Sequence, residues 1–147
     1  METSFVQSNP ADLKSSSFRL EPVWIVHAEL AARDDARVRE AVATAVGLHY
    51  GKYDRVAFES AGGVQFFHSL EGSHSGEGDG TISMPARVLS FSIAQDQHLL
   101  QSALEAIHHA HSYEEPVIYV MPGFASRAIY SERRDNPNRW WNRGFEF

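Results

Sequence analysis

The chain has 147 residues, the size of one ordinary domain, and its 43% of apolar residues is enough for a buried core. It carries a formal net charge of −6 and contains no cysteine. These numbers exclude disulfides, thiolate metal sites and a cysteine nucleophile, and they argue against broad binding to a nucleic-acid backbone. No segment reaches the ~18 apolar residues of a membrane span, and residues 1–20 lack the apolar region of a secretory signal. We therefore expect a cytoplasmic protein with no membrane partner.

The first part of the chain has the pattern of an arm, a strand and a helix. Residues 1–20 are polar and predict a flexible arm, whereas residues 23–30 are almost continuously apolar, as in a central strand. Asp34 and Asp35 are placed to cap a helix, and Gly47 is placed to end it. The apolar stripe of this helix consists of Val38, Ala41, Val42 and Ala45.

The middle of the chain predicts two further extended segments and a long loop. A strand is expected over residues 53–60, and the Ala-Gly-Gly sequence at 61–63 interrupts it. Extended structure resumes over residues 64–67. Residues 69–83 are rich in glycine and serine, which is typical of a loop.

The last part predicts a strand, a helix and a strand. Residues 86–93 alternate between apolar and polar types, so this strand should bury one face. Asp96 should cap the following helix, and the final strand should cover residues 116–121 and end at Pro122 and Gly123. The apolar stripe of the helix consists of Leu99, Leu100, Ala103, Leu104 and Ile107.

This order of elements is the split βαβ plan of an α+β, ferredoxin-like sandwich. Its helices cover only one face of the sheet, so the other face needs cover from the tail or from another subunit. We divide the chain into an arm (1–20), the ferredoxin-like domain (21–123) and a C-terminal tail (124–147). The tail combines aromatic residues with arginines: Tyr130, Trp140, Trp141, Phe145 and Phe147 with Arg133, Arg134, Arg139 and Arg143. We expect it to pack on the domain or on a neighbouring subunit; stacking on single-stranded bases and recruitment of a partner are the alternatives.

Four short motifs resemble those of one known family. Residues 111–116 read H-S-Y-E-E-P and are similar to the signature H-P-Y-E-E-P, and residues 51–54 are similar to G-x-Y-D. Residues 63–66 resemble G-x-Q-F, and residues 70–74 resemble the start of an E-G-S-N-P sequence. Together these motifs resemble the CutA/PII-like domain that is inserted in YqfO-type proteins of the Nif-three-like (Ngg-interacting factor) family, which also exists as a stand-alone form. The resemblance covers about residues 23–121.

The resemblance implies a CutA/PII-type fold and a homo-oligomer, most naturally a trimer. It also implies a regulatory module that holds a small molecule or a divalent metal at clefts between subunits. The dinuclear metal site of YqfO-type proteins lies in flanking domains that have no counterpart in this sequence. The chain departs from the family pattern at Ser112, where the family has proline, and at His74, where it commonly has asparagine.

Candidate site residues gather in the motifs and in the long loop. A metal would be held by His108 and His111, which are three residues apart near a helix end. The alternative is that His111 and Glu114 make hydrogen bonds at the corner between helix and strand, and that the long loop is only mobile. The predicted small-molecule site consists of Tyr53, Gln65, Phe66, Glu71, Tyr113 and Glu114.

A different class of function is also open at this point. The same scaffold could be a cofactor-independent cyclase, isomerase or lyase with a pocket lined by aromatic residues. A histidine of ordinary pKa near ~6.5 can act as a general base beside a tyrosine or glutamate acid. The catalytic residues would then be His68, His74, His111, Tyr53 and Glu115.

Overall fold

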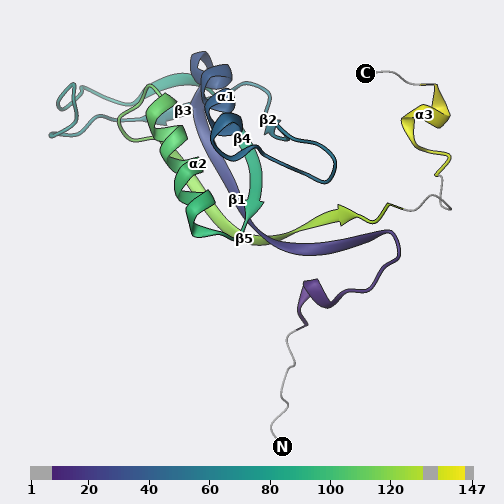
Figure 1. Cartoon of the computed structure of the whole chain (residues 1–147). Coiled ribbons are helices and arrows are strands. Elements are labelled where there is room, and N and C mark those ends of the chain that lie inside the picture. Colours follow the sequence, from purple (N-terminus) through teal and green to yellow (C-terminus); the bar gives the residue numbers. More distant parts are fainter. Residues whose placement is uncertain (1–7, 131–135, 145–147) are drawn as a thin grey trace, which may run out of the picture.

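The computed structural model describes residues 8–130 and 136–144 (Figure 1). Within these residues the chain runs from a short 3-10 helix, η1, through five strands, one further 3-10 helix and three α-helices. In chain order the elements are η1 (Pro10–Asp12), β1 (Phe18–Ala31), η2 (Ala32–Asp34), α1 (Asp35–Val46), β2 (Phe58–Glu59), β3 (Gly63–Phe67), β4 (Ile82–Ala94), α2 (Gln97–Ala110), β5 (Val117–Ala128) and α3 (Trp140–Arg143).

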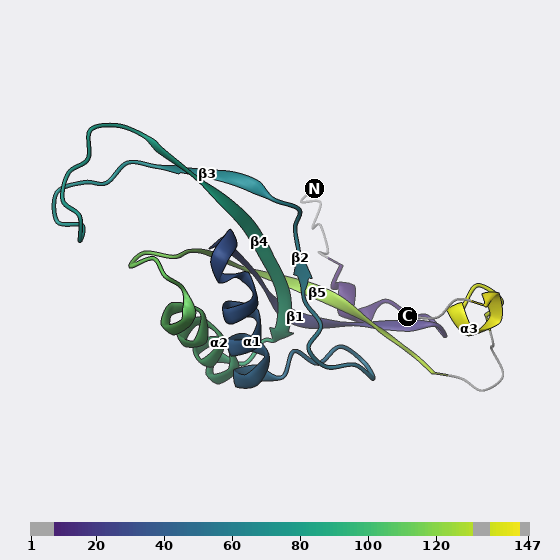
Figure 2. The same ribbon diagram turned by 90° about the horizontal axis from the view of Figure 1, so that it is seen from above.

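The strands form one antiparallel sheet in the order β2-β4-β1-β5, and β3 pairs with the other end of β4. Strand β1 lies between two partners: Val26 is opposite Phe91 of β4 on one side and Val120 of β5 on the other. This central position explains why β1 is apolar along most of its length. Helices α1 and α2 lie on the same side of the sheet (Figure 2), which confirms the predicted ferredoxin-like α+β fold.

The core lies between the two helices and the sheet. Alternate residues over 26–30 of β1 and 89–93 of β4 point into it, which confirms the alternation predicted for residues 86–93. Each large apolar side chain buried here contributes about 1.5–3 kcal/mol to stability. The fully or almost fully buried members are Val26, Ala28, Leu30, Val38, Val42, Ala43, Leu48, Leu89, Phe91, Ile93, Ala103 and Ile107.

Two of the predicted helix boundaries are confirmed, and one prediction about a cap is wrong. Gly47 ends α1 with a φ of 75°, and the carboxylate of Asp96 accepts a hydrogen bond of 3.0 Å from the amide of Leu99. Asp34 stands at the N-cap of α1, but its side chain makes no capping hydrogen bond. Its carboxylate bonds residues from a distant part of the chain instead.

Three strand boundaries differ from the prediction. Only Phe58 and Glu59 of residues 53–60 form a strand, because Tyr53 bridges Tyr50 and the next residues bond the end of α1 through their backbone. Strand β1 begins at Phe18, inside the predicted arm. Strand β5 continues through Pro122 to Ala128, since β5 is an edge strand and the missing amide of a proline is tolerated there.

The face of the sheet opposite the helices carries a row of exposed and half-buried side chains. Ile25 and His27 of β1 lie on this face, because they alternate with the core residues. Their neighbours on β5 are Met121, which is 38% exposed, and Tyr119, which is 58% exposed. We call these four residues the uncovered face.

The hairpin of β3 and β4, with the loop 68–81 that joins them, projects from the sheet (Figure 2). From here on, the arm means this hairpin and not residues 1–20. Val64 and Phe66 are exposed on this arm by 59% and 67%. No helix within the described ranges is long and apolar enough to cross a membrane.

Of the C-terminal tail, the structure describes residues 124–130, which continue β5 to Ala128, and residues 136–144. Within it, the rings of Trp140 and Trp141 meet edge to face with centroids 5.7 Å apart. Arg133, Arg134, Phe145 and Phe147 lie outside the described residues. The packing of the tail on the domain or on a neighbour stays a prediction, as does the division of the chain at residues 20 and 123.

Candidate functional site

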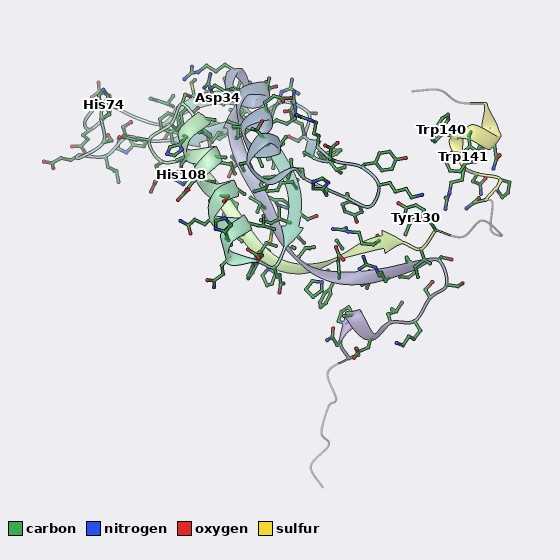
Figure 3. All side chains as sticks on the ribbon, viewed as in Figure 1. Asp34, His74, His108, Tyr130, Trp140 and Trp141 are labelled. Carbon is green, nitrogen blue, oxygen red and sulfur yellow. The ribbon has the colours of Figure 1, made fainter. Side chains whose placement is uncertain are left out.

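A buried carboxylate organises the corner where α2 leads into β5. Asp34 is fully buried, and its Oδ2 accepts hydrogen bonds from the amide and the hydroxyl of Ser112, at 3.0 and 2.6 Å. Its Oδ1 accepts a hydrogen bond from the guanidinium of Arg37. Arg37 also donates to the carbonyl of Ala110 at 2.7 Å. We call this network, together with His111, the corner; Figure 3 labels Asp34 within it.

His111 belongs to the corner, and both of its ring nitrogens are occupied. Its Nδ1 accepts the amide hydrogen of Tyr113 at 3.0 Å, so this nitrogen carries no proton. Its Nε2 lies 2.9 Å from the carbonyl oxygen of Glu29, which requires Nε2 to be the donor. The geometry therefore fixes a neutral imidazole that joins β1 to the corner. Neither nitrogen is free for a metal ion or for proton transfer in this arrangement.

The corner makes use of a departure from the family motif. Ser112 stands where the resembled signature has proline, and it bonds Asp34 through both its amide and its hydroxyl. A proline has no amide hydrogen and no hydroxyl, so it could make neither bond. In this chain Asp34 and Ser112 thus form a pair that the resembled motif could not form.

The surroundings of Asp34 lower its pKa. Burial alone would raise the pKa of this carboxyl, but the hydroxyl and amide of Ser112 and the charge of Arg37 outweigh it. Asp34 is consequently ionised at neutral pH, and both of its carboxylate oxygens accept hydrogen bonds.

The arm reaches back to this corner. The carboxylate of Glu114 accepts a hydrogen bond of 2.9 Å from the amide of His74, which lies in the loop of the arm. The ring of Phe67 on β3 lies 6.1 Å from the ring of Tyr113, measured between centroids. The structure therefore brings the two motif regions of residues 63–74 and 111–116 into contact, as a common site requires.

Two polar atoms near this contact are buried without a partner. Among the described residues, three buried side-chain atoms have no hydrogen-bond partner: the hydroxyl of Tyr113, the Oε1 of Gln65 and, on β1, the Nε1 of Trp24. Gln65 is two residues before Phe67 on β3, and side chains two apart share a face of a strand. Buried polar groups are nearly always bonded, so two such atoms in the predicted ligand site call for an explanation. We call this region, where the arm meets Tyr113, the arm site.

Other predicted residues lie outside the arm site. Tyr53 is 65% exposed on the segment after α1, and Phe66 is 67% exposed on the arm. Glu71 is exposed in the loop of the arm. The Nε2 of His68 lies 2.8 Å from the carbonyl of Gly78, so His68 holds the loop of the arm together.

His108 and Glu115 are brought together in a different place. Both line a shallow groove of about 380 Å³ between α2 and β5, whose other walls are apolar. His108 is exposed there, whereas His111 is buried, so the structure does not direct the two predicted metal ligands at one point. Within the described residues no group of three or more His, Cys, Asp or Glu side chains is arranged to hold a metal ion.

A second groove, of about 540 Å³, was not predicted from the sequence. It lies between the ribbon formed by β1 and β5 and the segment that follows α1. Its cationic lining residues are Arg19, Lys52 and Arg127, and Tyr130 closes one side. The only signal in the sequence was Lys52, in the G-x-Y-D motif, because the two arginines come from strand segments far away in the chain. We call it the basic groove.

Comparison with solved structures identifies the fold. A Bacillus cereus protein related to NIF3 superposes with a TM-score of 0.59 and 24% identity, over 70% of this chain. The chain spans only 26% of the length of that protein. The divalent ion tolerance protein CutA1 from Ehrlichia chaffeensis superposes with a TM-score of 0.50 and 13% identity, over 67% of this chain and 78% of CutA1.

The other comparisons do not extend the similarity beyond the fold. A nitrogen regulatory PII-like protein from Thiomonas intermedia matches 75% of this chain and 98% of its own at 14% identity, but with a TM-score of only 0.42. No family model and no curated protein matches the sequence. The similarities show the fold alone: the chain has the ferredoxin-like fold that is found in CutA1 and in part of the NIF3-related protein.

Proposed function

We propose that the chain is a regulatory module of the CutA/PII type, which binds a small molecule or a metal ion and assembles as a homotrimer. Its fold is that of a protein described as a divalent ion tolerance protein, and of part of a protein related to NIF3. We place it in the cytoplasm, in keeping with a chain that has no cysteine. The observation that carries the proposal is the pair of unpartnered buried atoms in the arm site.

The uncovered face supports assembly. Both helices lie on one side of the sheet, which leaves Ile25, Tyr119 and Met121 without a helix above them. A sheet in a two-layer domain is stable when both apolar faces are covered, and a neighbouring subunit can cover this one. In the proposed trimer, each uncovered face packs against the other two subunits.

The arm site limits what the ligand can be. The Oε1 of Gln65 only accepts hydrogen bonds, so a ligand must offer it a donor such as an amide, amine or hydroxyl. The hydroxyl of Tyr113 can donate or accept, so it places no such demand. A metal ion would need ligands from a neighbouring subunit, because the described residues of one chain supply no cluster of three.

Native mass spectrometry of the purified protein tests assembly and ligand together. We expect three subunits, with extra mass from a bound small molecule or metal. The variant Tyr119→Glu should dissociate the assembly, because a charge would be buried in the interface. Val56→Glu is the matched control, since Val56 is 39% exposed and lies away from the uncovered face.

The variant Tyr113→Phe separates the arm site from assembly. It removes only the unpartnered hydroxyl, so it should keep three subunits but lose most of the extra mass. Tyr119→Phe is its matched control and should keep both. A monomer without extra mass at micromolar concentration contradicts the proposal, as does a Tyr113→Phe protein that carries the same ligand as the native chain.

A further inference from the structure

The basic groove has a built geometry that the arm site does not explain. Arg127 lines it and is only 8% exposed. The guanidinium carbon of Arg127 lies 3.8 Å from the centre of the Tyr50 ring, and its Nη1 donates to the carbonyl of Ser126 at 3.2 Å. Cation–π contact and planar hydrogen bonding fix the orientation of this charge. Arg127 is therefore held in place before any ligand arrives.

Charges in the groove do not balance. Among the described residues that line it, Glu21 is the one carboxylate, and both of its oxygens are occupied: one by Arg19 at 2.6 Å, the other by Arg127 at 2.8 Å. Lys52 makes no ion pair within the described residues, and its Nζ lies 3.9 Å from the centre of the Tyr130 ring. Three cations thus face one anion, which leaves an excess of two positive charges. His49 also lines the groove.

Tyr130 is brought close by a glycine. Gly51 has a φ of 60°, and a Cβ at this position would lie 2.8 Å from the hydroxyl of Tyr130. Any other residue would have to move Tyr130 away and would also be strained at this φ. Gly51 and Lys52 therefore position the tyrosine ring and the ammonium group on the same wall of the groove.

We propose that the basic groove binds a small organic anion with at least two negative charges, carried by phosphate or carboxylate groups. The excess of two positive charges matches such a ligand, and guanidinium groups bind both kinds of oxyanion through paired hydrogen bonds. A volume of about 540 Å³ is in the range of sites for small organic molecules. None of its lining residues belongs to the arm site, so the two sites can be tested separately.

Isothermal titration calorimetry with inorganic pyrophosphate and with citrate tests the proposal. We expect at least one of them to bind, and Lys52→Gln and Arg19→Gln each to weaken its affinity at least ~10-fold, about 1.4 kcal/mol. Lys14→Gln is the matched control, because Lys14 is the only other lysine in the chain and does not line the groove. Binding of pyrophosphate alone assigns phosphate as the recognised group, and binding of citrate alone assigns carboxylate.

Two results overturn the proposal. One is the absence of binding by both anions at low ionic strength, where charge attraction is strongest. The other is binding that Lys52→Gln and Lys14→Gln weaken equally, because that reflects the overall charge of the protein rather than the groove. Light scattering on the same samples records the subunit number, so a failed trimer and an empty groove give different outcomes.

Discussion

The corner and the basic groove lie at the two ends of α1, and they treat charge in opposite ways. In the corner, the carboxylate of Asp34 is surrounded by donors that match it, from Ser112 and Arg37. In the groove, Arg19, Lys52 and Arg127 share a single carboxylate. A network whose hydrogen bonds and charges are all paired within the protein has no group left to bind a ligand. A network with unpaired positive charge does. We therefore propose that the corner serves stability, and that the groove and the arm site serve binding.

The largest expected effect comes from removing the carboxylate of the corner. Asp34→Ala should lower the free energy of unfolding by about 3 kcal/mol, because it leaves the donors of Ser112 and Arg37 without their buried partner. Asp35→Ala is the matched control, since Asp35 is half-buried and lies 3.7 Å from its nearest cation, Arg87. Urea denaturation measures both. Equal losses in the two variants would show that the corner does not hold the fold together.

Acid should weaken the same network. The pKa of Asp34 is lower in the folded protein than the ~3.9 of an unfolded chain, so its contribution to stability is complete above that value. The contribution is lost as the pH falls through the lowered pKa of the folded state. Urea midpoints between about pH 5 and pH 3 should therefore fall more steeply for the native chain than for Asp34→Asn. Parallel curves would contradict the assignment of an ionised Asp34.

A smaller loss is expected at Ser112. Ser112→Ala removes the hydroxyl donor to Asp34 but keeps the amide donor, which should cost about 1–2 kcal/mol in the free energy of unfolding. Ser112→Pro removes both donors and should cost more. The backbone itself does not oppose this change, since His111 before it already has an extended conformation, with φ −73° and ψ 141°. A proline variant as stable as the alanine variant would show that the amide bond adds nothing.

The smallest change in stability should occur in the groove. Lys52→Gln should alter the free energy of unfolding by no more than about 0.5 kcal/mol, because the lysine is exposed and makes no ion pair within the described residues. It should nevertheless weaken anion binding, which is the reverse of the pattern expected for Asp34→Ala. A thermal unfolding scan beside the calorimetric titration compares the two effects. A large loss of stability would show that Lys52 supports the fold rather than binding alone.

The core elements could be predicted because their signals are local. Alternation over residues 86–93 reports a strand with one buried face, and Asp96 and Gly47 mark helix ends whatever lies around them. The end of the last strand could not be predicted, because whether Pro122 is tolerated depends on which edge of the sheet it occupies. The strand expected over residues 53–60 is only two residues long for a similar reason: the backbone amides of Arg55 and Val56 bond the carbonyls of Gly47 and Leu48 at the end of α1.

The sites were only partly predictable. The sequence indicated that residues 63–74 and 111–116 belong together, and the contacts of Glu114 with His74 and of Tyr113 with Phe67 place them side by side. It could not separate the roles of individual histidines, because burial and the acceptor opposite each ring nitrogen are tertiary properties. His111 is neutral and bonded on both sides, whereas His108, three residues earlier, lies exposed in another groove.

By itself, the sequence determined the order of elements, the ferredoxin-like plan and the absence of thiol chemistry, since these follow from local periodicity and composition. The tertiary structure alone decided what each charge does. Asp34 looked like a helix cap, but it bonds Ser112, 78 residues away. Arg19 and Arg127 meet Lys52 only because β1 and β5 pair alongside the segment after α1. The energy of a charge depends on the groups within a few ångströms of it, and folding determines which groups those are.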